Sequence, residues 1–525
     1  MSASAVRGPG GGRDVPSALT AVRRRRELER LAEGWRPDLL VVGAGFTGAG
    51  IALDAALRGL SVAVVDRADL ASGTSRWSSK LVHGGLRYLA GGDLALARES
   101  ALERGVLMER VAPHLVRPLP FVTPLNAGMP PVSGALAGLG YLAGNALRLS
   151  AGTSGLTLPG PRLVGPRRAR AMVPAIGRPA LRGAWVNTDG QLVDDVRAVV
   201  AIARTAAAFG AAVLPHVAVT AVGADRADLV DARTGEGFEA RAGRVVVAAG
   251  AWSDALDDRV VLRPSKGVHL VLDGAALGHP TAAVAAPVPG HLSRFVFALP
   301  QLDGRVYLGL TDDPVSGAVP DEAPVLDAER DFLLDAISRV LDRPLTPSDV
   351  VGGYAGYRPL VAGGEGAAPA ATADLSRAHL VLDDPDGPIT IVGGKLTTYR
   401  RMAADVVDRV SDRPCTTDRQ PLVGALPRRR LPDVPARPWL VARYGGEAPD
   451  LEALIAADPW LAGPVVDGLP HLRVELAFAV RREGATSVAD LLDRRTRIGL
   501  VASDRDAAVP IAEEVLARTP PLRTD

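Results

Sequence analysis

The stretch from Asp38 to Asp66, "DLLVVGAGFTGAGIALDAALRGLSVAVVD", constrains the fold of this chain more than any other part of it. The apolar run at 39–42 leads directly into "GAGFTG", an alanine-rich helical pattern follows, and a second apolar run at 62–65 ends in an acid. Strand, glycine turn, helix, strand and acid are the ordered parts of a dinucleotide-binding unit. The sequence therefore predicts a Rossmann-like βαβ unit at this position.

Each residue of the fingerprint has an expected task. Gly43 permits a tight turn, Gly45 lets a pyrophosphate approach the helix N-terminus, and Gly48 lets helix and strand pack closely. Asp66 lies 18 residues beyond Gly48 and is placed to accept a hydrogen bond from a ribose hydroxyl. The fingerprint alone does not distinguish NAD from FAD.

Bulk properties narrow the class of protein. A chain of 525 residues is too long for one ordinary core, and 47% hydrophobic with 23% charged residues is typical of a globular protein. The net charge of +1 gives no reason to expect nucleic-acid binding. The single cysteine, Cys415, excludes an internal disulfide and a cysteine-based metal cluster, and we expect no metal site.

Two segments resemble membrane or surface elements but have simpler interpretations. "GALAGLGYLAGNALRL" is interrupted by glycines, so we expect a buried helix of small residues instead of a membrane span. Residues 1–35 are expected to form a solvated N-terminal tail, in which residues 23–31 can begin a short helix. Its run of four arginines at 23–26 leaves contact with an anionic membrane or nucleic acid open.

The order of patterns predicts an α/β fold with an α+β substrate part. Strand and helix patterns typical of a Rossmann-like domain recur in separated segments, at 36–120, 186–261 and 351–410. The strand-rich segments 121–185 and 262–350 are expected to form a mixed-sheet substrate domain, and 411–525 a C-terminal helical domain. A nucleotide domain assembled from discontinuous segments favours FAD over NAD, by analogy with other flavoproteins.

The segment "VVGAGFTGAGIALDAALRGLSVAVVDRADLASGTSRWSSKLVHGGLRYL" resembles the FAD-dependent glycerol-3-phosphate dehydrogenases. "TDGQLVDDVR", "AAGAWSD", "RPSKGVHL", "YRPL" and "VGGKLTTYR" resemble later blocks of that family in the same order, from about residue 36 to 515. The chain departs from the family pattern at Ala90, Leu310 and Ala378. These departures concern the substrate loops and leave the flavin motifs intact.

The resemblance implies a set of site residues. For the cofactor it implies Gly43, Gly45, Gly48, Asp66, Thr74, Ser75, Ser79, Lys80, His83, Ala249, Gly250, Trp252, Gly394, Leu396 and Thr397. For a substrate phosphate it implies Arg87, Tyr88, Thr311, Arg377 and Lys395. His269 is the expected general base, because neutral imidazole accepts protons near neutral pH, and Arg358 is its expected partner near the reacting carbon.

The implied reaction is the oxidation of sn-glycerol 3-phosphate to dihydroxyacetone phosphate by hydride transfer to FAD. A membrane quinone is the expected acceptor, with the protein attached peripherally at the cytoplasmic face of the membrane and a homodimer as one option. Alternatives are an oxidase that uses oxygen, a relative acting on another small phosphorylated or carboxylated alcohol, an amine-oxidising flavoprotein, and a flavin-binding protein without turnover.

Lysine usage suggests a further hypothesis. Of 60 basic residues only three are lysines, namely Lys80, Lys266 and Lys395, and all three lie in Gly- or Ser-rich polar segments. Because a compact ammonium differs from a planar guanidinium, positions that keep lysine in an arginine-rich chain are expected to need it. We therefore predict that the three lysines mark one site. If 265–272 is a strand, Lys266 and His269 face opposite sides unless Gly267 bends the chain.

Overall fold

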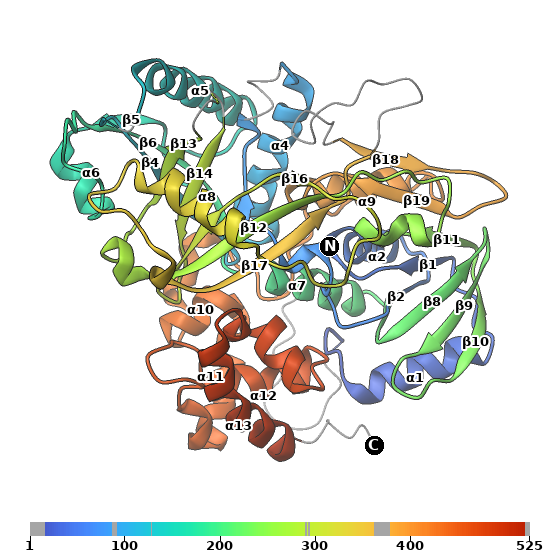
Figure 1. Ribbon diagram of the computed structural model, residues 1–525. Helices are drawn as coiled ribbons and strands as arrows, with labels where there is room; N and C mark the ends of the chain where they lie inside the picture. Colours follow the sequence, from blue (N-terminus) through green and yellow to red (C-terminus); the bar gives the residue numbers. More distant parts are fainter. Residues whose placement is uncertain are drawn as a thin grey trace.

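The structure is a computed structural model, and it describes residues 16–86, 92–127, 129–288, 291, 294–361 and 378–519. It contains a six-stranded sheet that confirms the Rossmann-like prediction (Figure 1). The strand order is β18 (His379–Leu382), β19 (Ile389–Gly393), β11 (Arg244–Val247), β1 (Leu39–Val42), β2 (Val62–Asp66) and β7 (Ala212–Pro215). All neighbours pair in parallel except β18 with β19.

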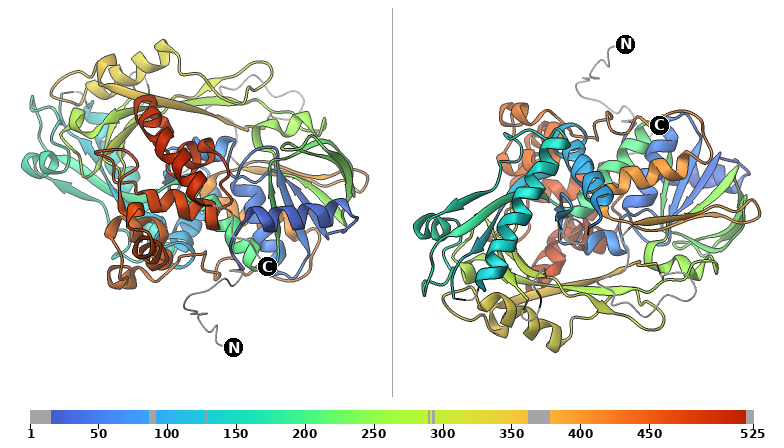
Figure 2. Two further views of the ribbon diagram at one scale, coloured as in Figure 1. Left: turned by 90° about the horizontal axis from the view of Figure 1, so that it is seen from below. Right: turned by 90° about the horizontal axis from the view of Figure 1, so that it is seen from above.

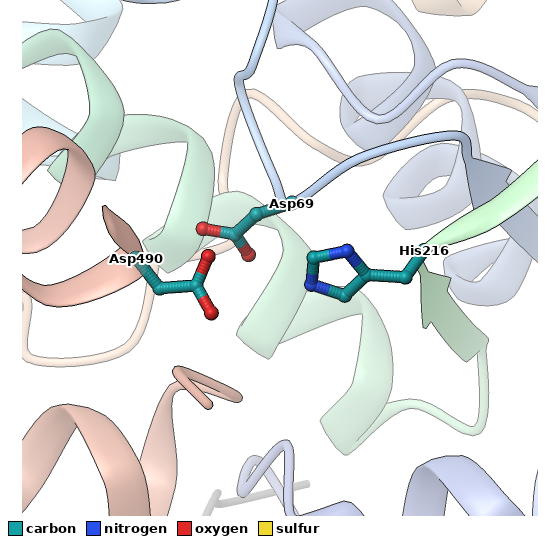
Figure 3. Close-up of side chains that lie close together, drawn as sticks. All are labelled: Asp69, His216 and Asp490. Atoms are coloured by element: carbon teal, nitrogen blue, oxygen red, sulfur yellow. The ribbon is translucent and has the colours of Figure 1, made fainter. Parts of the chain in front are cut away.

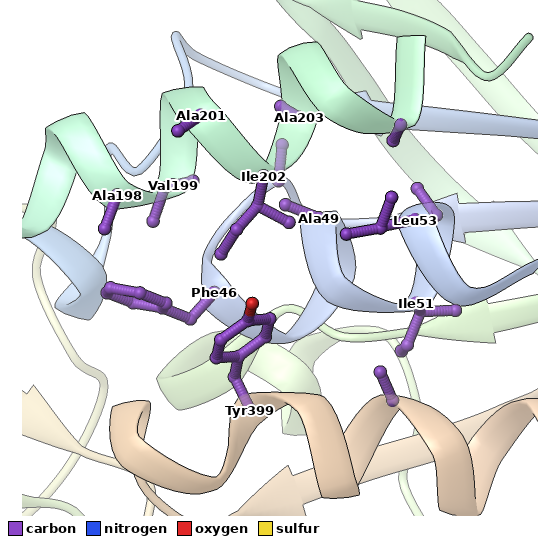
Figure 4. Packing of buried hydrophobic residues seen from close by; sticks show 14 of the residues in the cluster. Phe46, Ala49, Ile51, Leu53, Ala198, Val199, Ala201, Ile202, Ala203 and Tyr399 are labelled. Carbon is purple, nitrogen blue, oxygen red and sulfur yellow. The ribbon is translucent and has the colours of Figure 1, made fainter. Parts of the chain in front are cut away.

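Helices cover this sheet because its strands are apolar on both faces. Helix α2 (Phe46–Leu57) packs between α7 (Asp195–Ala208) and α9 (Tyr399–Val407), and ten of its residues are buried (Figure 4). The Phe46 ring lies 5.9 Å from the Tyr399 ring. Segments more than 300 residues apart in sequence thus share one core, which is why the domain needs discontinuous pieces.

The glycines of the fingerprint perform their predicted structural tasks. Gly43 has a φ of +102°, a backbone conformation that glycine adopts without strain. A Cβ atom on Gly48 would overlap the carbonyl oxygen of Gly43, so any side chain there would force α2 away from β1.

A second, ten-stranded sheet lies beside the first. Its order is β16 (Asp313–Pro314), β12 (Ser265–Asp273), β15 (Arg305–Gly309), β14 (Phe295–Pro300), β13 (Ala283–Pro287), β4 (Val116–Pro124), β6 (Ala184–Leu192) and β3 (Leu81–Val82). Strand β17 (Val350–Arg358) pairs with β12, and β5 (Arg162–Val164) pairs with β6. The nearby helices are α4 (Leu94–Val106), α5 (Pro131–Ser150), α6 (Pro166–Met172) and α8 (Asp327–Ser338).

Strand membership differs from the predicted segment boundaries at several points. Most of β4 and β17, and all of β3, were expected in nucleotide-domain segments but belong to the ten-stranded sheet. Most of β6 was likewise expected in a nucleotide-domain segment but belongs to the ten-stranded sheet. Local patterns identify strands but not their partners, because pairing is set by long-range contacts. The division into domains therefore stays a proposal.

Two further groups of elements complete the fold. A three-stranded antiparallel sheet, β8 (Val217–Val222), β9 (Arg226–Asp231) and β10 (Gly237–Arg241), flanks the six-stranded sheet. The C-terminal part is helical, as predicted, with α10 (Pro438–Tyr444), α11 (Ala448–Ala457), α12 (Arg473–Arg482) and α13 (Ala502–Arg518) around their own apolar core. Figure 2 shows these red helices on the side seen from below.

A helix is present where 23–31 could begin one, but the prediction that the tail is solvated is wrong for its described part. Residues Ala21–Ala32 form helix α1, and Leu31 is buried. Arg24 forms a buried ion pair with Asp231 at 2.7 Å, while Arg23 donates to the carbonyl oxygens of Ala207 and Ala211. A charge run does not reveal that its arginines meet carbonyls and a carboxylate from distant segments.

The predicted burial of the segment 134–149 is also wrong. It forms most of α5, which buries only Ser133, Gly134 and Gly138 and exposes several leucines. An apolar, glycine-containing pattern is compatible with a buried helix and with a helix whose apolar side faces outward, so sequence alone could not separate them. No helix within the described ranges combines the length and hydropathy that a membrane-spanning segment needs.

Candidate active site

One large cavity lies between the two sheets and unites most of the predicted site residues. Its volume is about 1760 Å³, well above the roughly 300–1,000 Å³ of ordinary small-ligand sites. The carboxyl ends of β1, β2, β11 and β19 contribute one wall, where nucleotides bind in open parallel sheets. Strands β12, β14 and β17 and helix α5 contribute the opposite wall.

The cavity wall near α2 fits the pyrophosphate and ribose of a dinucleotide. Gly43, Gly45 and Thr47 line the cavity at the N-terminus of α2, where backbone N–H groups and the helix dipole favour an anion. Ser75 Oγ accepts a hydrogen bond from the Phe46 N–H at 3.0 Å. The described residues thus supply an anion-binding helix start within a cavity large enough for a long cofactor.

Asp66 closes the ribose end of this wall. Its carboxylate accepts hydrogen bonds from the Ala44 and Ala68 N–H groups at 2.7 and 3.0 Å and from the Ser72 hydroxyl at 3.2 Å. These bonds hold the side chain at the end of β2, where it also lines the cavity. Burial raises the pKa of Asp66, and the two backbone N–H donors oppose that shift.

A second helix begins at the cavity, directly after strand β19 of the same sheet. After β19 the chain turns through Gly393 and Gly394, both with positive φ, and reaches Lys395 just before a helical turn that runs into α9. The other predicted cofactor residues on the cavity wall are Thr74, Ser79, His83, Ala249, Gly250, Trp252, Gly394, Leu396 and Thr397. Gly48 does not line the cavity, because its task is to let α2 and β1 pack.

His269 lies on the opposite wall, held by two partners. Its Nε2 is 2.8 Å from Ser79 Oγ, and its ring stacks on Tyr354 with centroids 4.8 Å apart and 12° between the ring planes. The antiparallel register of β12 and β17 sets His269 directly opposite Tyr354. The Tyr354 hydroxyl donates to the Ser78 carbonyl at 2.9 Å, which ties the aromatic wall to the segment carrying Ser79.

Arg358 lies on the same strand pair and reaches the cavity in a fixed orientation. Its guanidinium donates to Ser265 Oγ at 2.9 Å, to Asp312 Oδ1 at 3.1 Å and to the Thr311 carbonyl at 3.0 Å. Thr311 also lines the cavity and accepts a hydrogen bond from the Val268 N–H. The structure therefore brings Arg358 and Thr311 to the wall that carries His269.

His269 is built to remain neutral. Burial and the nearby cations Lys80 and Arg358 lower its pKa to about 3, since each disfavours an added positive charge. A neutral imidazole has a lone pair that can accept a proton at ordinary pH, but the lowered pKa makes it a weaker base than a free imidazole, so its role as the general base stays a prediction. His114, buried elsewhere, has its pKa lowered to about 3 by burial and by Arg197.

These two imidazoles predict a pH-dependent stability. Above about pH 6.5 both are neutral in folded and unfolded chains and contribute nothing; below it the unfolded chain binds protons that the folded chain refuses. The free energy of unfolding should therefore decrease as the pH is lowered below about 6.5, by up to about 1.4 kcal/mol per pH unit for each histidine. Denaturant unfolding between neutral and mildly acidic pH measures this slope, and His114→Gln should flatten it; an unchanged slope would contradict the assignment.

The prediction that three lysines mark one site is wrong for two of them. Lys80 Nζ is buried and pairs with Asp195 at 3.0 Å, and Lys266 pairs with Glu329 at 2.8 Å on the face of β12 opposite His269. Neither side chain lines the cavity, and the Lys80 ammonium is already engaged by Asp195. Lys395 does line it and donates to Ser100 Oγ at 2.9 Å. Arg87, Tyr88 and Arg377 lie outside the described residues.

A cluster of two acids and a histidine lies where the loop after β2 meets the C-terminal segment. Figure 3 shows Asp69, His216 and Asp490 with their polar atoms turned toward one another, within 4.8 Å. Arg495 binds both oxygens of Asp69 at 2.6 and 3.0 Å, and Arg494 bridges Asp69 and Asp490 at 3.0 Å each. Because guanidinium groups already neutralise both carboxylates, the cluster connects the loop after β2 to the C-terminal helices and does not favour a cation.

Sequence reasoning missed several residues of the site. Tyr354 could have been found by counting back in steps of two from Arg358 along a strand, since alternate residues share a face. The aromatic residues Phe121, Phe295 and Phe297 also line the cavity, but their positions depend on sheet pairing that no local pattern reveals.

Comparison with known proteins agrees with this geometry. Residues 38–400 match the family described as FAD dependent oxidoreductase, and residues 415–519 match the C-terminal domain of alpha-glycerophosphate oxidase. Glycerol-3-phosphate dehydrogenase 1 of Mycobacterium tuberculosis is 46% identical over 520 residues, covering 96% of this chain and 99% of that protein. Glycerol-3-phosphate dehydrogenase of Synechocystis is 32% identical, covering 89% and 90%.

Solved structures of related proteins have the same fold as this chain. The glycerol-3-phosphate dehydrogenase from Bacillus halodurans, complexed with FAD, superposes with a TM-score of 0.69 at 27% identity and covers 95% of this chain and 94% of its own. L-alpha-glycerophosphate oxidase from Mycoplasma pneumoniae, at 16% identity and a TM-score of 0.55, shares the fold.

Proposed function

The chain belongs to the FAD-dependent glycerol-3-phosphate dehydrogenase family, and on that premise we propose that it oxidises sn-glycerol 3-phosphate to dihydroxyacetone phosphate, with a membrane quinone as the final acceptor. FAD is its cofactor. One observation carries the proposal: a buried neutral imidazole, a fixed guanidinium and a lysine ammonium line the same cavity as the dinucleotide loop.

The proton and the hydride leave the substrate by different routes. Bound FAD supplies the acceptor for the hydride from C2. His269 Nε2 takes the hydroxyl proton, so the C2–O bond becomes a carbonyl as the C–H and O–H bonds break. For this, Nε2 must be the unprotonated nitrogen, and Ser79 Oγ donates to it until the substrate hydroxyl takes that place.

Arg358 and Tyr354 hold this arrangement. The guanidinium, fixed by Ser265, Asp312 and Thr311, places positive charge beside the oxygen on which negative charge develops. The Tyr354 ring fixes the plane of the imidazole. Both contributions are present before substrate enters, which lowers the cost of reorganisation.

The phosphate is proposed to bind at the other end of the substrate. Lys395 supplies a compact ammonium and Thr311 a hydroxyl on the cavity wall. Arg87, Tyr88 and Arg377 are proposed as further ligands on the strength of the family pattern. A phosphate dianion needs several donors, which distinguishes this substrate from the amines and amino acids that related folds oxidise.

We propose that the protein attaches peripherally at the inner face of the cytoplasmic membrane. The apolar part of the cavity wall favours a quinone as the electron acceptor. Phe121, Phe295 and Phe297 offer little to a phosphorylated triol but suit a lipophilic ring. Oxygen as acceptor is the second candidate, because the C-terminal match is to an oxidase domain. A homodimer stays a prediction.

The acceptor is tested by reducing the holoprotein with sn-glycerol 3-phosphate without oxygen and then mixing it with a quinone analogue or with oxygenated buffer. We expect reoxidation by the quinone to be much faster than by oxygen. Faster reoxidation by oxygen, with release of peroxide, would make the protein an oxidase.

A further inference from the structure

A buried arginine from the C-terminal helical part lies behind the wall that carries His269. Arg497 directly precedes a short helical turn, Ile498–Leu500, and is only 5% exposed. Its φ is +66°, in the left-handed region that residues other than glycine rarely adopt. Arg495, two residues earlier, binds both oxygens of Asp69, which anchors this part of the backbone. The chain is thus held in an uncommon conformation with the Arg497 side chain inside the protein.

The segment that follows Arg497 packs against the back of this wall. Leu500 packs on the apolar cluster that contains Tyr354, the ring on which His269 stacks. A Cβ atom added to Gly352, on β17, would lie 2.2 Å from the Leu500 carbonyl oxygen, so the strand and the segment are in direct contact. The C-terminal part of the chain therefore supports the strand that holds Tyr354 opposite His269.

The Arg497 guanidinium contacts aromatic rings instead of hydrogen-bond acceptors. Its Cζ lies 5.0 Å from the ring centroid of Trp77 and 5.9 Å from that of Tyr354. Its Nε and both Nη atoms are buried, and none of them has a hydrogen-bond partner among the described residues. A buried guanidinium normally forms several hydrogen bonds, because donors left unpaired cost free energy. Here the attraction between a cation and aromatic faces takes the place of those bonds.

Two carboxylates keep this guanidinium charged. Burial alone would lower the pKa of Arg497, but Asp195 and Asp194 at the start of α7 outweigh it, so the pKa lies above its usual value. Neither carboxylate forms a hydrogen bond to the guanidinium. Asp195 already binds Lys80 and Ser78. Asp194 caps the first turn of α7. The charge is therefore retained, while the contacts of the side chain are to the aromatic rings.

The rings that Arg497 touches belong to a stack that ends at the proposed base. The imidazole of His269 is nearly parallel to the Tyr354 ring, at 12° between the planes, and Tyr354 is 24° from the plane of Trp77. A cation that holds Tyr354 and Trp77 in place also limits rotation of the imidazole, because stacked rings restrain one another. A general base is effective only when its nitrogen is aimed at the proton that it removes.

We propose that Arg497 is a positioning residue for the oxidation of the substrate: through Tyr354 it fixes the plane of the His269 imidazole, so that Nε2 points at the hydroxyl proton. Arg497 does not line the cavity, so it acts without touching the substrate. The C-terminal helical part thereby contributes to the reaction as well as to the fold. This inference rests on the proposed function of His269.

The test compares Arg497→Met, which keeps most of the bulk but removes the charge, with Arg497→Lys, which keeps the charge. In the holoprotein we expect Arg497→Met to lower the limiting rate of anaerobic flavin reduction about tenfold, while substrate affinity changes by less than about twofold. Arg497→Lys should recover most of the rate. Stopped-flow absorbance of the flavin at increasing concentrations of sn-glycerol 3-phosphate gives both quantities.

The matched control is Arg428→Met. Arg428 is another arginine by which the C-terminal part contacts the rest of the chain, since it donates to the carbonyl oxygens of Met108 and Val116, and it does not line the cavity. Its loss should lower the stability of the protein and leave the limiting rate unchanged. A role of Arg497 in stability alone would give the same result for Arg497→Met, and would overturn the proposal.

A double-mutant cycle with Tyr354→Leu tests the route of the effect. If Arg497 acts through Tyr354, adding Arg497→Met to Tyr354→Leu should lower the rate no further, and additive losses would overturn the proposal. If Arg497→Met does not yield folded holoprotein, Arg497→Gln is compared with Arg497→Lys, and equal rates for this pair would overturn it as well. Failure of the substrate to reduce the flavin of the unchanged protein would instead reject the proposed function, and this inference with it.

Discussion

Changing His269 to alanine is expected to slow anaerobic flavin reduction by sn-glycerol 3-phosphate by roughly 10²–10⁴-fold, the usual contribution of a general base. Substrate affinity should change by no more than a few-fold, since the phosphate ligands remain in place. Stopped-flow absorbance of the flavin measures both, because the limiting rate and its dependence on substrate concentration are obtained separately.

The matched control is His291→Ala, another histidine on the cavity wall and one with no assigned role. It should leave the limiting rate near that of the unchanged protein. If His269→Ala reduces its flavin as fast as the control, His269 is not the base, and His83, which also lines the cavity, becomes the next candidate.

Changing Lys80 to methionine is expected to destabilise the folded protein by about 3–5 kcal/mol, because it leaves the buried Asp195 carboxylate without its cation. Asp195 also accepts hydrogen bonds from the Ser78 hydroxyl and N–H, and Lys80 lies 5.3 and 5.4 Å from the Tyr307 and Tyr354 rings. Denaturant unfolding followed by circular dichroism measures the loss.

Two variants make this prediction specific. Adding Asp195→Asn to Lys80→Met should recover part of the stability, because the unpaired charge is removed. Lys395→Met should instead weaken substrate binding with little effect on unfolding, since that side chain lines the cavity. If Lys80→Met and Lys395→Met had the same two effects, the distinction between a structural and a ligand-binding lysine would be lost.

The parts of the fold that follow from short-range pattern were predictable. The βαβ unit needs particular residues at Gly43, Gly48 and Asp66, and each has a steric or hydrogen-bonding task that depends on nearby chain. His269 could be placed for a similar reason, because strand alternation puts it on the face opposite Lys266. In both cases the relevant geometry spans only a few residues.

Side-chain contacts and helix orientations that depend on residues far away in the sequence were not predictable. Lys80 and Lys395 both lie in polar, Gly- or Ser-rich segments, yet one meets Asp195 and the other faces the cavity. Arginine-rich α1 meets carbonyl groups from α7 and from the segment after it. The side of α5 that faces outward depends on the position of β6, more than thirty residues further along the chain.

We expect this cavity to remove a hydride from C2 of sn-glycerol 3-phosphate and a proton from its hydroxyl group. An anaerobic titration of the purified holoprotein, in which the flavin absorbance is followed as substrate is added, measures this most directly. The expected result is complete two-electron bleaching near one equivalent of sn-glycerol 3-phosphate, and none with glycerol, which lacks the phosphate. A flavin that stays oxidised with excess sn-glycerol 3-phosphate, or that glycerol bleaches equally well, would contradict it.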